Sequence, residues 1–481
     1  MTDFTFSRKR DGTFQVEGCD NASSELIIPA QHEGRPVTSI ADNAFSWCYQ
    51  IRKAVIPETV SVIGESAFSW CESLEEVLIP DTVKTIGEWA FTGCQSLQRV
   101  RLPQGLKTIG YSCFQSCVSL TMVEIPPLVC QIGPEAFSEC RNLRHVFLPD
   151  SLTFLGDNAF AACESLTYIN LPEQLAVIGK HVFSGCTSLS EFDISSHHPC
   201  LCVNNGFLIN RREKSLLFYS HNPDSQERNI QIPNGIEVIA EEALAGRIMI
   251  ESIRIPDSVR IIESKAFYGC RGLKSVSLPE SIVRIDSSAF HSCSGLISIT
   301  LPEKLSIIDY AVFYACNSLK TVSFPKSLRF ISSCAFSGCG SLSGLSLPDS
   351  LIYIGDSAFE GCRSIEKVHF SDNIESVGSH VFGSCSSLES VLLNDKIRII
   401  PFRAFSRCQN LICIDLPEGI EEIKGEAFDS CENLLTVRMP DSIRSVDPDA
   451  FRNCRHLTLY VHPGSYAHRF AREEKLPYTL M

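Results

Sequence analysis

The chain has 481 residues, of which 44% are hydrophobic and 20% are charged, and its formal net charge is −14. The basic residues do not cluster into a stripe along the sequence, so we do not expect nucleic acid as a partner. No apolar run reaches the roughly eighteen residues that would span a bilayer, so we expect no membrane insertion. Residues 1–14 show no secretory signal, which favours a cytoplasmic location.

Residues 1–34 are predicted to form an N-terminal cap. The segment FTFSRKRDGTFQV alternates apolar and polar residues around Asp11 and Gly12, a pattern typical of a β-hairpin. A cap is needed because residues 35–194 form a repeat array, whose open end would otherwise expose its strands.

The repeat of residues 35–194 is 23 residues long and begins at a proline. One copy, PETVSVIGESAFSWCESLEEVLI, runs from Pro57 to Ile79, and the next begins at Pro80. With the proline as position 0, apolar residues recur at +3, +6, +10, +11, +14, +17, +20 and +22. Residues two apart in a strand share a face, so +20 and +22 point inward while +19 and +21 point outward. The period predicts a repeat solenoid of about 17 coils, in which each coil packs only against its neighbours.

Three residue types recur at fixed positions of the repeat. Sixteen coils have Phe at +11, from Phe45 to Phe451, which predicts a continuous buried spine. Sixteen of the 23 cysteines occupy +14, from Cys48 to Cys454; we expect reduced, buried thiols, since side-by-side Cβ vectors do not suit a disulfide. Gly at +7 suits either a positive φ or a close backbone approach. The AFxxC segment between these columns is expected to form a single helical turn at most.

Residues 195–232 interrupt the repeat. The stretch NNGFLINRREKSLLFYS has two apolar runs around a charged turn, which predicts an inserted β-hairpin. Just before it, HHPCLC offers His197, His198, Cys200 and Cys202 as soft metal ligands. Zinc sites more often use C-x-x-C spacing, so we expect no metal and no cofactor.

The repeat resumes over residues 233–462, and residues 463–481 are predicted to form a helical C-terminal cap. Ser465 is placed as the N-cap, with Tyr466, Phe470 and Ala471 on one helical face. Leu476 and Pro477 end the helix.

The combined signature LPxxLxxIGxxAFxxCxSLxxVxL resembles the BspA-like leucine-rich repeat family. The resemblance covers residues 35–194 and 233–463. It implies a right-handed, curved leucine-rich-repeat superhelix with a parallel β-sheet on its concave side. Members of the family look like adhesion and protein-binding modules, often on cell surfaces or secreted.

The outward strand positions +19 and +21 form the surface on which we expect binding. In the first array they place aromatic side chains and arginines together, the residue types enriched at interface hot spots. The second array offers a flat Ser/Thr field from Ser275 to Ser346. The candidate partner-binding residues are Arg99, Arg101, Met122, His145, Phe147, Tyr168 and Asn170.

These observations favour a non-enzymatic scaffold that binds a protein, or alternatively a glycan, on the concave sheet. The sequence has no phosphate loop, G-x-S-x-G or H-E-x-x-H motif. A second hypothesis is an intracellular structural or regulatory repeat protein that uses its convex side or the inserted hairpin. A third is an enzyme or metal protein built around residues 195–232. We expect a monomer.

Overall fold

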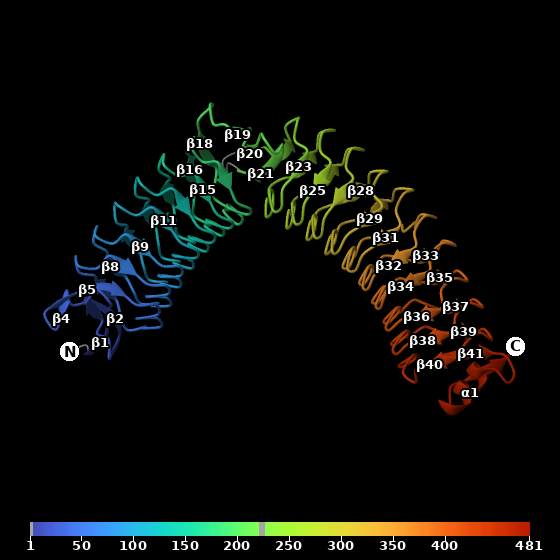
Figure 1. The fold of residues 1–481 in the computed structure, drawn as a ribbon. Coiled ribbons are helices and arrows are strands. Elements are labelled where there is room, and N and C mark those ends of the chain that lie inside the picture. Colours follow the sequence, from blue (N-terminus) through green and yellow to red (C-terminus); the bar gives the residue numbers. More distant parts are fainter. Residues whose placement is uncertain (1–2, 221–226) are drawn as a thin grey trace. The chain divides into compact units, whose positions relative to one another are not determined.

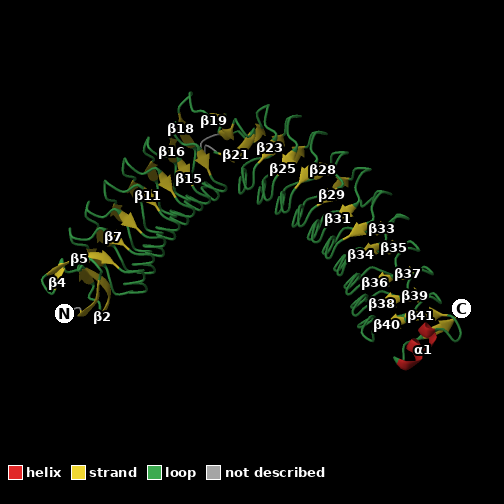
Figure 2. Ribbon diagram, viewed as in Figure 1, coloured by secondary structure: helices red, strands yellow, loops and turns green. Residues whose placement is uncertain are grey.

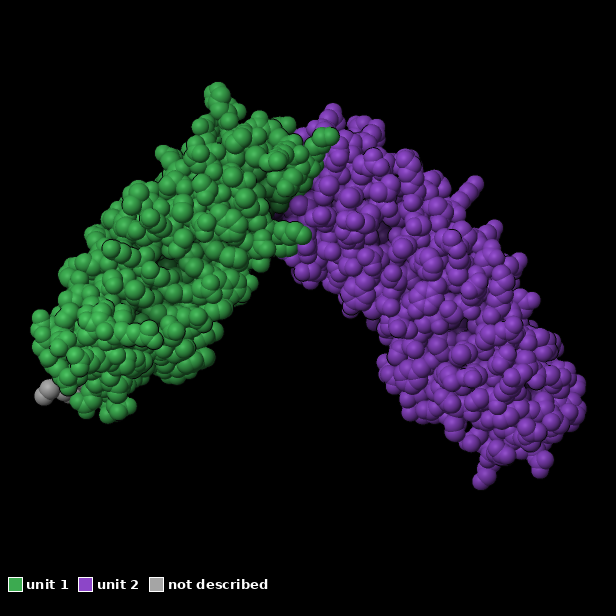
Figure 3. Space-filling view, viewed as in Figure 1, with its two compact units in different colours: residues 1–225 green, residues 226–481 purple. Residues whose placement is uncertain are grey.

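The computed structural model describes residues 3–220 and 227–481. Residues 1–2 of the predicted cap and 221–226 of the predicted insertion lie outside the described residues. The chain divides into two compact units, Met1–Ser225 (unit 1) and Gln226–Met481 (unit 2), coloured separately in Figure 3. Each unit is a stack of coils, which confirms the predicted solenoid (Figure 1).

In unit 1, the strands at +19 to +21 pair in parallel as an eight-stranded ladder. We call these strands the long-strand ladder, and their exposed +19 and +21 side chains the long-strand face. The inward residue of the strands from β3 to β16, such as Val77, Val100 or Val146, is buried, because the side chains alternate between core and solvent. The strands are β3 (Glu25–Ile27), β6 (Lys53–Val55), β8 (Glu76–Leu78), β10 (Arg99–Arg101), β12 (Met122–Glu124), β14 (His145–Phe147), β16 (Tyr168–Leu171) and β18 (Glu191–Ile194).

A second series of strands, mostly two residues long, lies near positions +5 and +6 and also pairs in parallel. We call it the short-strand ladder. In unit 1 it comprises β5 (Arg35–Ile40), β7 (Val62–Ile63), β9 (Thr85–Ile86), β11 (Thr108–Ile109), β13 (Gln131–Ile132), β15 (Phe154–Leu155) and β17 (Val177–Ile178).

Unit 2 repeats both ladders. Its long-strand ladder is divided into groups of three, two, two and four strands, and a single bridge joins Thr321 to Gly344. The long strands are β22 (Asn229–Gln231), β24 (Ser252–Arg254), β26 (Ser275–Ser277), β28 (Ser298–Thr300), β30 (Thr321–Ser323), β33 (Lys367–His369), β35 (Ser390–Leu392), β37 (Cys413–Asp415), β39 (Thr436–Arg438), β41 (Thr458–Val461) and β42 (Tyr478–Leu480). The short strands are β23 (Val238–Ile239), β25 (Ile261–Ile262), β27 (Arg284–Ile285), β29 (Ile307–Ile308), β31 (Phe330–Ile331), β32 (Tyr353–Ile354), β34 (Ser376–Val377), β36 (Ile399–Ile400), β38 (Glu422–Ile423) and β40 (Ser445–Val446).

The segment around AFxxC, which we call the turn edge, consists of linked turns rather than helical turns (Figure 2). Its residues at +9 and +13 have positive φ, for example 53° at Ser66 and 58° at Trp70. Alternate amides therefore point along the stack: the Phe68 N–H donates to the carbonyl of Ala90 in the next coil at 2.8 Å. The amides between them close local turns, as Ser69 N–H does on the Ser66 carbonyl at 3.0 Å. A regular helix would satisfy these amides within one coil and leave the next coil unpaired.

The Phe residues at +11 form one stack of parallel rings in each unit. Neighbouring ring centroids are 5.2–6.4 Å apart in unit 1 and 4.9–6.1 Å apart in unit 2. Unit 1 ends its stack at Phe183, which packs edge-on against Phe192 and Phe218. Leu244 takes the Phe position in the coil that precedes Phe267.

The cysteines at +14 make a second column beside the rings. The Cys71 thiol donates to the carbonyl oxygen of Phe45, in the preceding coil, at 3.1 Å, and the same contact recurs from coil to coil. Burial raises the pKa of Cys71 to about 12. The column is therefore a hydrogen-bonded packing element, as the packing interpretation predicted.

Glycine occurs at +7 because consecutive coils approach each other closely there, and not because the backbone has a positive φ. A Cβ at Gly87 would lie 2.5 Å from the Glu65 nitrogen, and one at Gly64 would lie 2.6 Å from the carbonyl carbon of Ala41. Neither glycine has a positive φ. The corner between consecutive coils therefore has no room for a side chain at these two positions.

Antiparallel strands lie at the start of the chain and in the interrupted region. At the start, β1 (Asp3–Arg8) pairs with β2 (Phe14–Asp20), and β4 (Gln31–His32) pairs with β5. In the interrupted region, β19 (Leu201–Asn204), β20 (Phe207–Asn210) and β21 (Ser215–Tyr219) form an antiparallel meander with two hairpins where one was predicted.

Helix α1 (Tyr466–Glu473) follows the last coil and is the one helix among residues 3–220 and 227–481. The Ser465 side chain accepts the His468 N–H, as predicted for its N-cap. Ala467, Phe470 and Ala471 are the buried residues of the helix, whereas Tyr466 is only partly covered. The chain then adds β42 to β41 in parallel, a strand that the sequence did not suggest.

Candidate functional site

Four adjacent strands carry the predicted binding residues. Their register aligns Arg99 with Met122, Met122 with His145, and His145 with Tyr168 across β10, β12, β14 and β16. Paired strands lie about 4.8 Å apart, so the residues form one row on the long-strand face. Inward-pointing valines and isoleucine fix this orientation, because a shift of one residue would expose them. The structure thus brings the predicted residues together along the ladder.

Two large apolar side chains are exposed on this part of the long-strand face: Met122 lies in the row, and Phe147 lies at +21, in register with Glu124. Phe147 is 59% exposed and Met122 is 48% exposed, although both are large hydrophobic side chains. The Phe147 ring lies 6.0 Å from the Tyr168 ring at a tilt of 51°. Exposed apolar side chains that are contiguous mark interaction surfaces more often than scattered ones do.

Tyr168 is tied to the acidic end of the row. Its hydroxyl donates a 3.0 Å hydrogen bond to the Asp193 carboxylate, on neighbouring strand β18. Partial burial and this hydrogen bond raise the pKa of the Tyr168 hydroxyl. The phenol therefore stays neutral and donating at physiological pH, with its ring fixed beside Phe147.

The two arginines at the other end differ in their contacts. Arg101 Nη2 lies 2.7 Å from the Asp81 carboxylate, and this contact lowers the pKa of Asp81 and raises that of Arg101. Asp81 also accepts the Gln104 N–H at 3.0 Å. Arg99 is exposed, and its side chain has no ion pair within the described part of the chain. Arg99 is therefore the guanidinium that is available to a partner.

Asn170 supports the surface from within. Its Nδ2 donates to the Leu148 carbonyl at 2.7 Å, and its Oδ1 accepts the Leu148 N–H at 2.8 Å. The side chain thereby continues the pairing of β14 with β16 beyond their two backbone-registered residue pairs. Its amide is committed to the fold, a role that residue type alone did not reveal.

A second apolar row was missed by the sequence analysis. Ile27, Val55 and Leu78 are paired in register across β3, β6 and β8, and Ile27 and Leu78 are 59% and 45% exposed. Val55 and Leu78 were readable as +21 residues, but Ile27 precedes the first recognisable repeat. Because β3 already pairs with β6, the long-strand ladder begins inside residues 1–34.

A shallow pocket of about 420 Å³ lies over β22, β24 and β26, at the start of the Ser/Thr field of unit 2. Ser252 donates to the Asn229 side chain at 2.6 Å on its floor. The field has no large anchoring side chain from Ser275 to Ser323, and Gly344 leaves the next coil without one.

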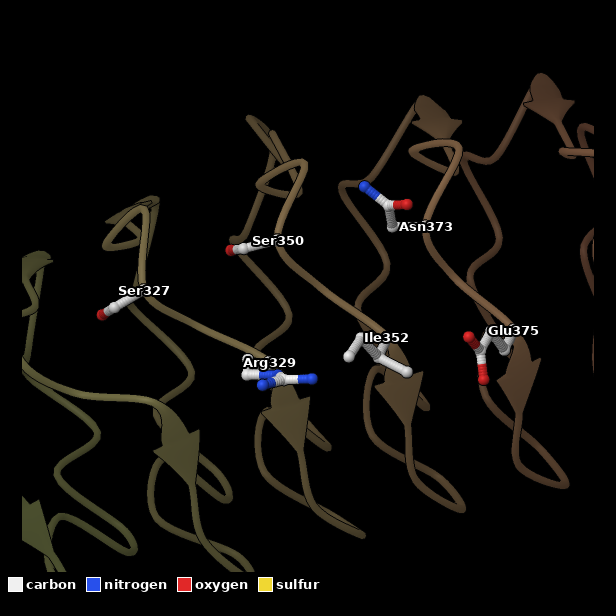
Figure 4. A pocket seen from close by; sticks show the side chains of 6 residues that line it. All are labelled: Ser327, Arg329, Ser350, Ile352, Asn373 and Glu375. Atoms are coloured by element: carbon white, nitrogen blue, oxygen red, sulfur yellow. The ribbon is translucent and has the colours of Figure 1, made fainter.

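A further pocket of about 390 Å³ lies at a corner of three coils in unit 2 (Figure 4). Ile352 lies between the charged side chains of Arg329 and Glu375 in this view. Two polar side chains of this pocket already form hydrogen bonds within the protein. Ser350 donates to the Leu328 carbonyl at 2.6 Å, and Asn373 donates to the Asp349 carbonyl at 2.8 Å. Most of its polar groups therefore join coils.

The HHPCLC segment does not assemble as a ligand set in the described residues. His198 is buried, and its Nδ1 accepts the N–H groups of Cys200 at 3.2 Å and Leu201 at 3.0 Å. Burial lowers the pKa of His198. His197 is exposed and its Nδ1 lies 3.3 Å from the Ser196 hydroxyl. Since Nδ1 of His198 already accepts two backbone amides, it orders the turn that leads into β19.

No helix in residues 3–220 or 227–481 combines the length and the apolar character that a bilayer crossing demands.

Comparisons with known proteins agree with this architecture. The family model of the BspA type leucine rich repeat region matches residues 38–163, 107–204, 217–343 and 329–458. No curated protein matches the sequence.

Three solved structures illustrate what this chain is similar to. A leucine-rich repeat protein from Eubacterium ventriosum is 18% identical over 79% of this chain and 92% of its own, with a TM-score of 0.56. A leucine rich cell surface protein from Faecalibacterium prausnitzii is 24% identical over 98% of this chain and 96% of its own, with a TM-score of 0.46. A leucine rich repeat protein of T. pallidum is 31% identical over 39% of this chain and 87% of its own, with a TM-score of 0.37. The first of these similarities shows the fold.

Proposed function

Because this chain belongs to the BspA type leucine-rich repeat family, we propose that it is a non-enzymatic scaffold that binds a protein partner through the long-strand face of unit 1. The repeat architecture supports a binding role, since stacked coils create an extended surface without an enclosed site. The proposed binding surface includes the predicted residues between Arg99 and Tyr168. It also includes the second apolar row, which consists of Ile27, Val55 and Leu78.

The contact between Phe147 and Tyr168 carries the proposal. Phe147 is exposed and Tyr168 is partly exposed, and charged side chains border the pair at Glu124 on one side and at Glu191 and Asp193 on the other, with Arg99 one strand beyond Glu124. An apolar core with a polar rim is the usual anatomy of a protein–protein interface. Tyr and Arg are also among the residue types that dominate binding energy.

The order of side chains along the ladder indicates the chemistry of the partner. Apolar Ile27, Val55 and Leu78 come first, Arg99 and Arg101 follow, Met122 and Glu124 come next, and the aromatic pair comes last. A complementary partner surface would place an acidic group between two apolar contacts. Arg99 would supply the ion pair, because Arg101 already contacts Asp81.

The test measures affinity for a native partner captured with the full chain. Phe147→Ala combined with Tyr168→Ala should weaken binding by at least about tenfold, which corresponds to about 1.4 kcal/mol. The matched control is Ser298→Ala with Thr321→Ala, in the Ser/Thr field of unit 2, which should leave affinity unchanged. Far-UV circular dichroism verifies that the variants fold.

The alternatives predict other outcomes. Deleting Asn204–Tyr219 would remove buried Phe207 and Leu208, so an inserted-hairpin site is better tested by substituting exposed Val203 and Lys214 with Ser. Loss of binding in that variant, with normal binding in the Phe147/Tyr168 variant, would contradict the proposal. A captured partner that lost its affinity after enzymatic deglycosylation would point to a glycan instead.

A further inference from the structure

The turn edge of unit 1 carries an exposed aromatic cluster that is separate from the long-strand face. It consists of Trp47, Tyr49 and Trp70, on two consecutive coils. The chain has three tryptophans, and the third, Trp89, lies in the next coil. Trp89 is in contact with Tyr111, with ring centroids 5.0 Å apart.

The two tryptophans are held in fixed planes. Trp47 and Trp70 stack with centroids 5.2 Å apart and planes 7° apart. Both have positive φ, 62° and 58°, and their N–H groups donate to the carbonyls of Ser69 and Thr92 in the following coils. A Cβ on Gly93 would lie 2.6 Å from the Trp70 ring, so the absence of a side chain at Gly93 leaves room for this ring. The cluster is therefore ordered before any ligand arrives.

One face of Trp47 is open. Trp70 covers the opposite face, yet Trp47 is 53% exposed, which requires that its outer face and edge meet solvent. Tyr49 is 48% exposed and stands at 66° to Trp47, with centroids 6.1 Å apart. The two rings thus make a corner with a flat indole wall and a phenol wall.

The segment that carries Trp47 and Tyr49 is uncharged and offers donors, and Glu72 takes the repeat position of Tyr49 in the next coil. Residues 46–50 read SWCYQ and contain no charged side chain. Ser46 and Ser69 share a 2.8 Å hydrogen bond beside the rings, and Gln50 is exposed. Neither indole N–H of Trp47 and Trp70 has an acceptor within residues 3–220 and 227–481.

These features select the ligand class. A flat aromatic wall stacks against a ring that presents aliphatic C–H groups, while indole and phenol groups and an amide hydrogen-bond to hydroxyls. A pyranose ring combines such a C–H face with equatorial hydroxyls and carries no charge. We propose that Trp47 and Tyr49 form a stacking site for a neutral pyranose of an oligosaccharide, independent of the protein-binding face.

The test uses the full chain and three neutral oligosaccharides, namely maltohexaose, cellohexaose and lacto-N-neotetraose. Since all three tryptophans lie in adjacent coils, binding should shift tryptophan fluorescence saturably with at least one probe. Isothermal titration calorimetry gives the affinity independently of the tryptophan signal. Trp47→Ala should weaken that binding at least about tenfold, and Trp47→Phe should restore part of it, because Phe retains an aromatic face.

Phe147→Ala is the matched control, since it removes an equally exposed aromatic from the long-strand face and should leave sugar binding unchanged. Its expected loss of protein-partner affinity separates failure of this proposal from failure of the proposed function. Absence of saturable binding with all three probes, or normal affinity in Trp47→Ala, would overturn the sugar site. Saturable binding of a proline-rich decapeptide in place of the sugars would also overturn it.

Discussion

The thiol of Cys94 donates a 3.2 Å hydrogen bond to the carbonyl oxygen of Phe68, in the preceding coil. That carbonyl also accepts the Cys71 N–H of its own coil at 3.3 Å. The two columns that the repeat makes visible, Phe and Cys, are therefore linked to each other across every such step. The cysteine column fills space in the core and also joins coils.

The buried thiols should make stability fall at alkaline pH. Burial raises the pKa of Cys140 and Cys339 to about 12, whereas a thiol in an unfolded chain loses its proton above about pH 8.5. Because the folded pKa is raised, this contribution is complete below the unfolded pKa and is lost as pH rises toward about 12. The free energy of unfolding should therefore decrease steadily as pH rises through that window. Urea unfolding at about pH 8 and about pH 10 measures the slope, and Cys140→Ala should reduce it.

Thiol reactivity gives a second reading of the same column. Cys94 and Cys316 are buried, whereas Cys413 is exposed on β37. Native-state alkylation followed by mass spectrometry should label Cys413 rapidly and the two column cysteines only after unfolding. Rapid labelling of Cys94 in the folded protein would refute the buried column.

Loss of one ring from the Phe stack should destabilise unit 2 most. Phe313 is fully buried between Phe290 at 5.6 Å and Phe336 at 5.3 Å, so Phe313→Ala should cost about 3–5 kcal/mol. Coils couple only to neighbours, and all tryptophans lie in unit 1. Circular dichroism should therefore show an early transition that tryptophan fluorescence does not follow. Equal shifts by both probes would contradict this local behaviour, and Phe147→Ala, an exposed ring, serves as the control.

Two glycines on consecutive coils should respond oppositely to alanine. A Cβ at Gly87 would lie 2.5 Å from the Glu65 nitrogen, and backbone cannot move aside cheaply, so Gly87→Ala should destabilise by about 1–3 kcal/mol. Gly105 has nothing within 4 Å of its Cβ position and no positive φ, so Gly105→Ala should be neutral or stabilising by up to about 1 kcal/mol. Urea unfolding of both variants compares them directly. Unchanged stability in Gly87→Ala would show that the corner tolerates a side chain.

The period made the interior of this fold predictable. Residues such as Phe91, Cys94 and Val100 point inward because their positions recur every 23 residues, and the parallel ladder follows from stacking those positions. The same reasoning placed His145, Phe147 and Tyr168 side by side, since outward positions are fixed once inward ones are known.

The turn edge could not be predicted in the same way. Residues with positive φ include Ser66, Trp70 and Ala162, which have no intrinsic preference for that conformation. Pairing of their amides with the next coil stabilises the conformation, and that pairing involves no side chain. Two further features could not be predicted from the repeat. The Asn170 side chain bonds to the backbone of Leu148, a contact that residue type does not reveal, and Ile27 lies before the first repeat proline.

A photoreactive phenylalanine analogue tests the central claim, which is partner binding on the long-strand face. It would be placed at Phe147 and, in a control protein, at Phe402, an exposed ring on the turn edge of unit 2. On irradiation, the captured partner should become crosslinked to the analogue at position 147 and not to the analogue at position 402. Crosslinking from position 402 alone, with none from position 147, would contradict binding on the long-strand face.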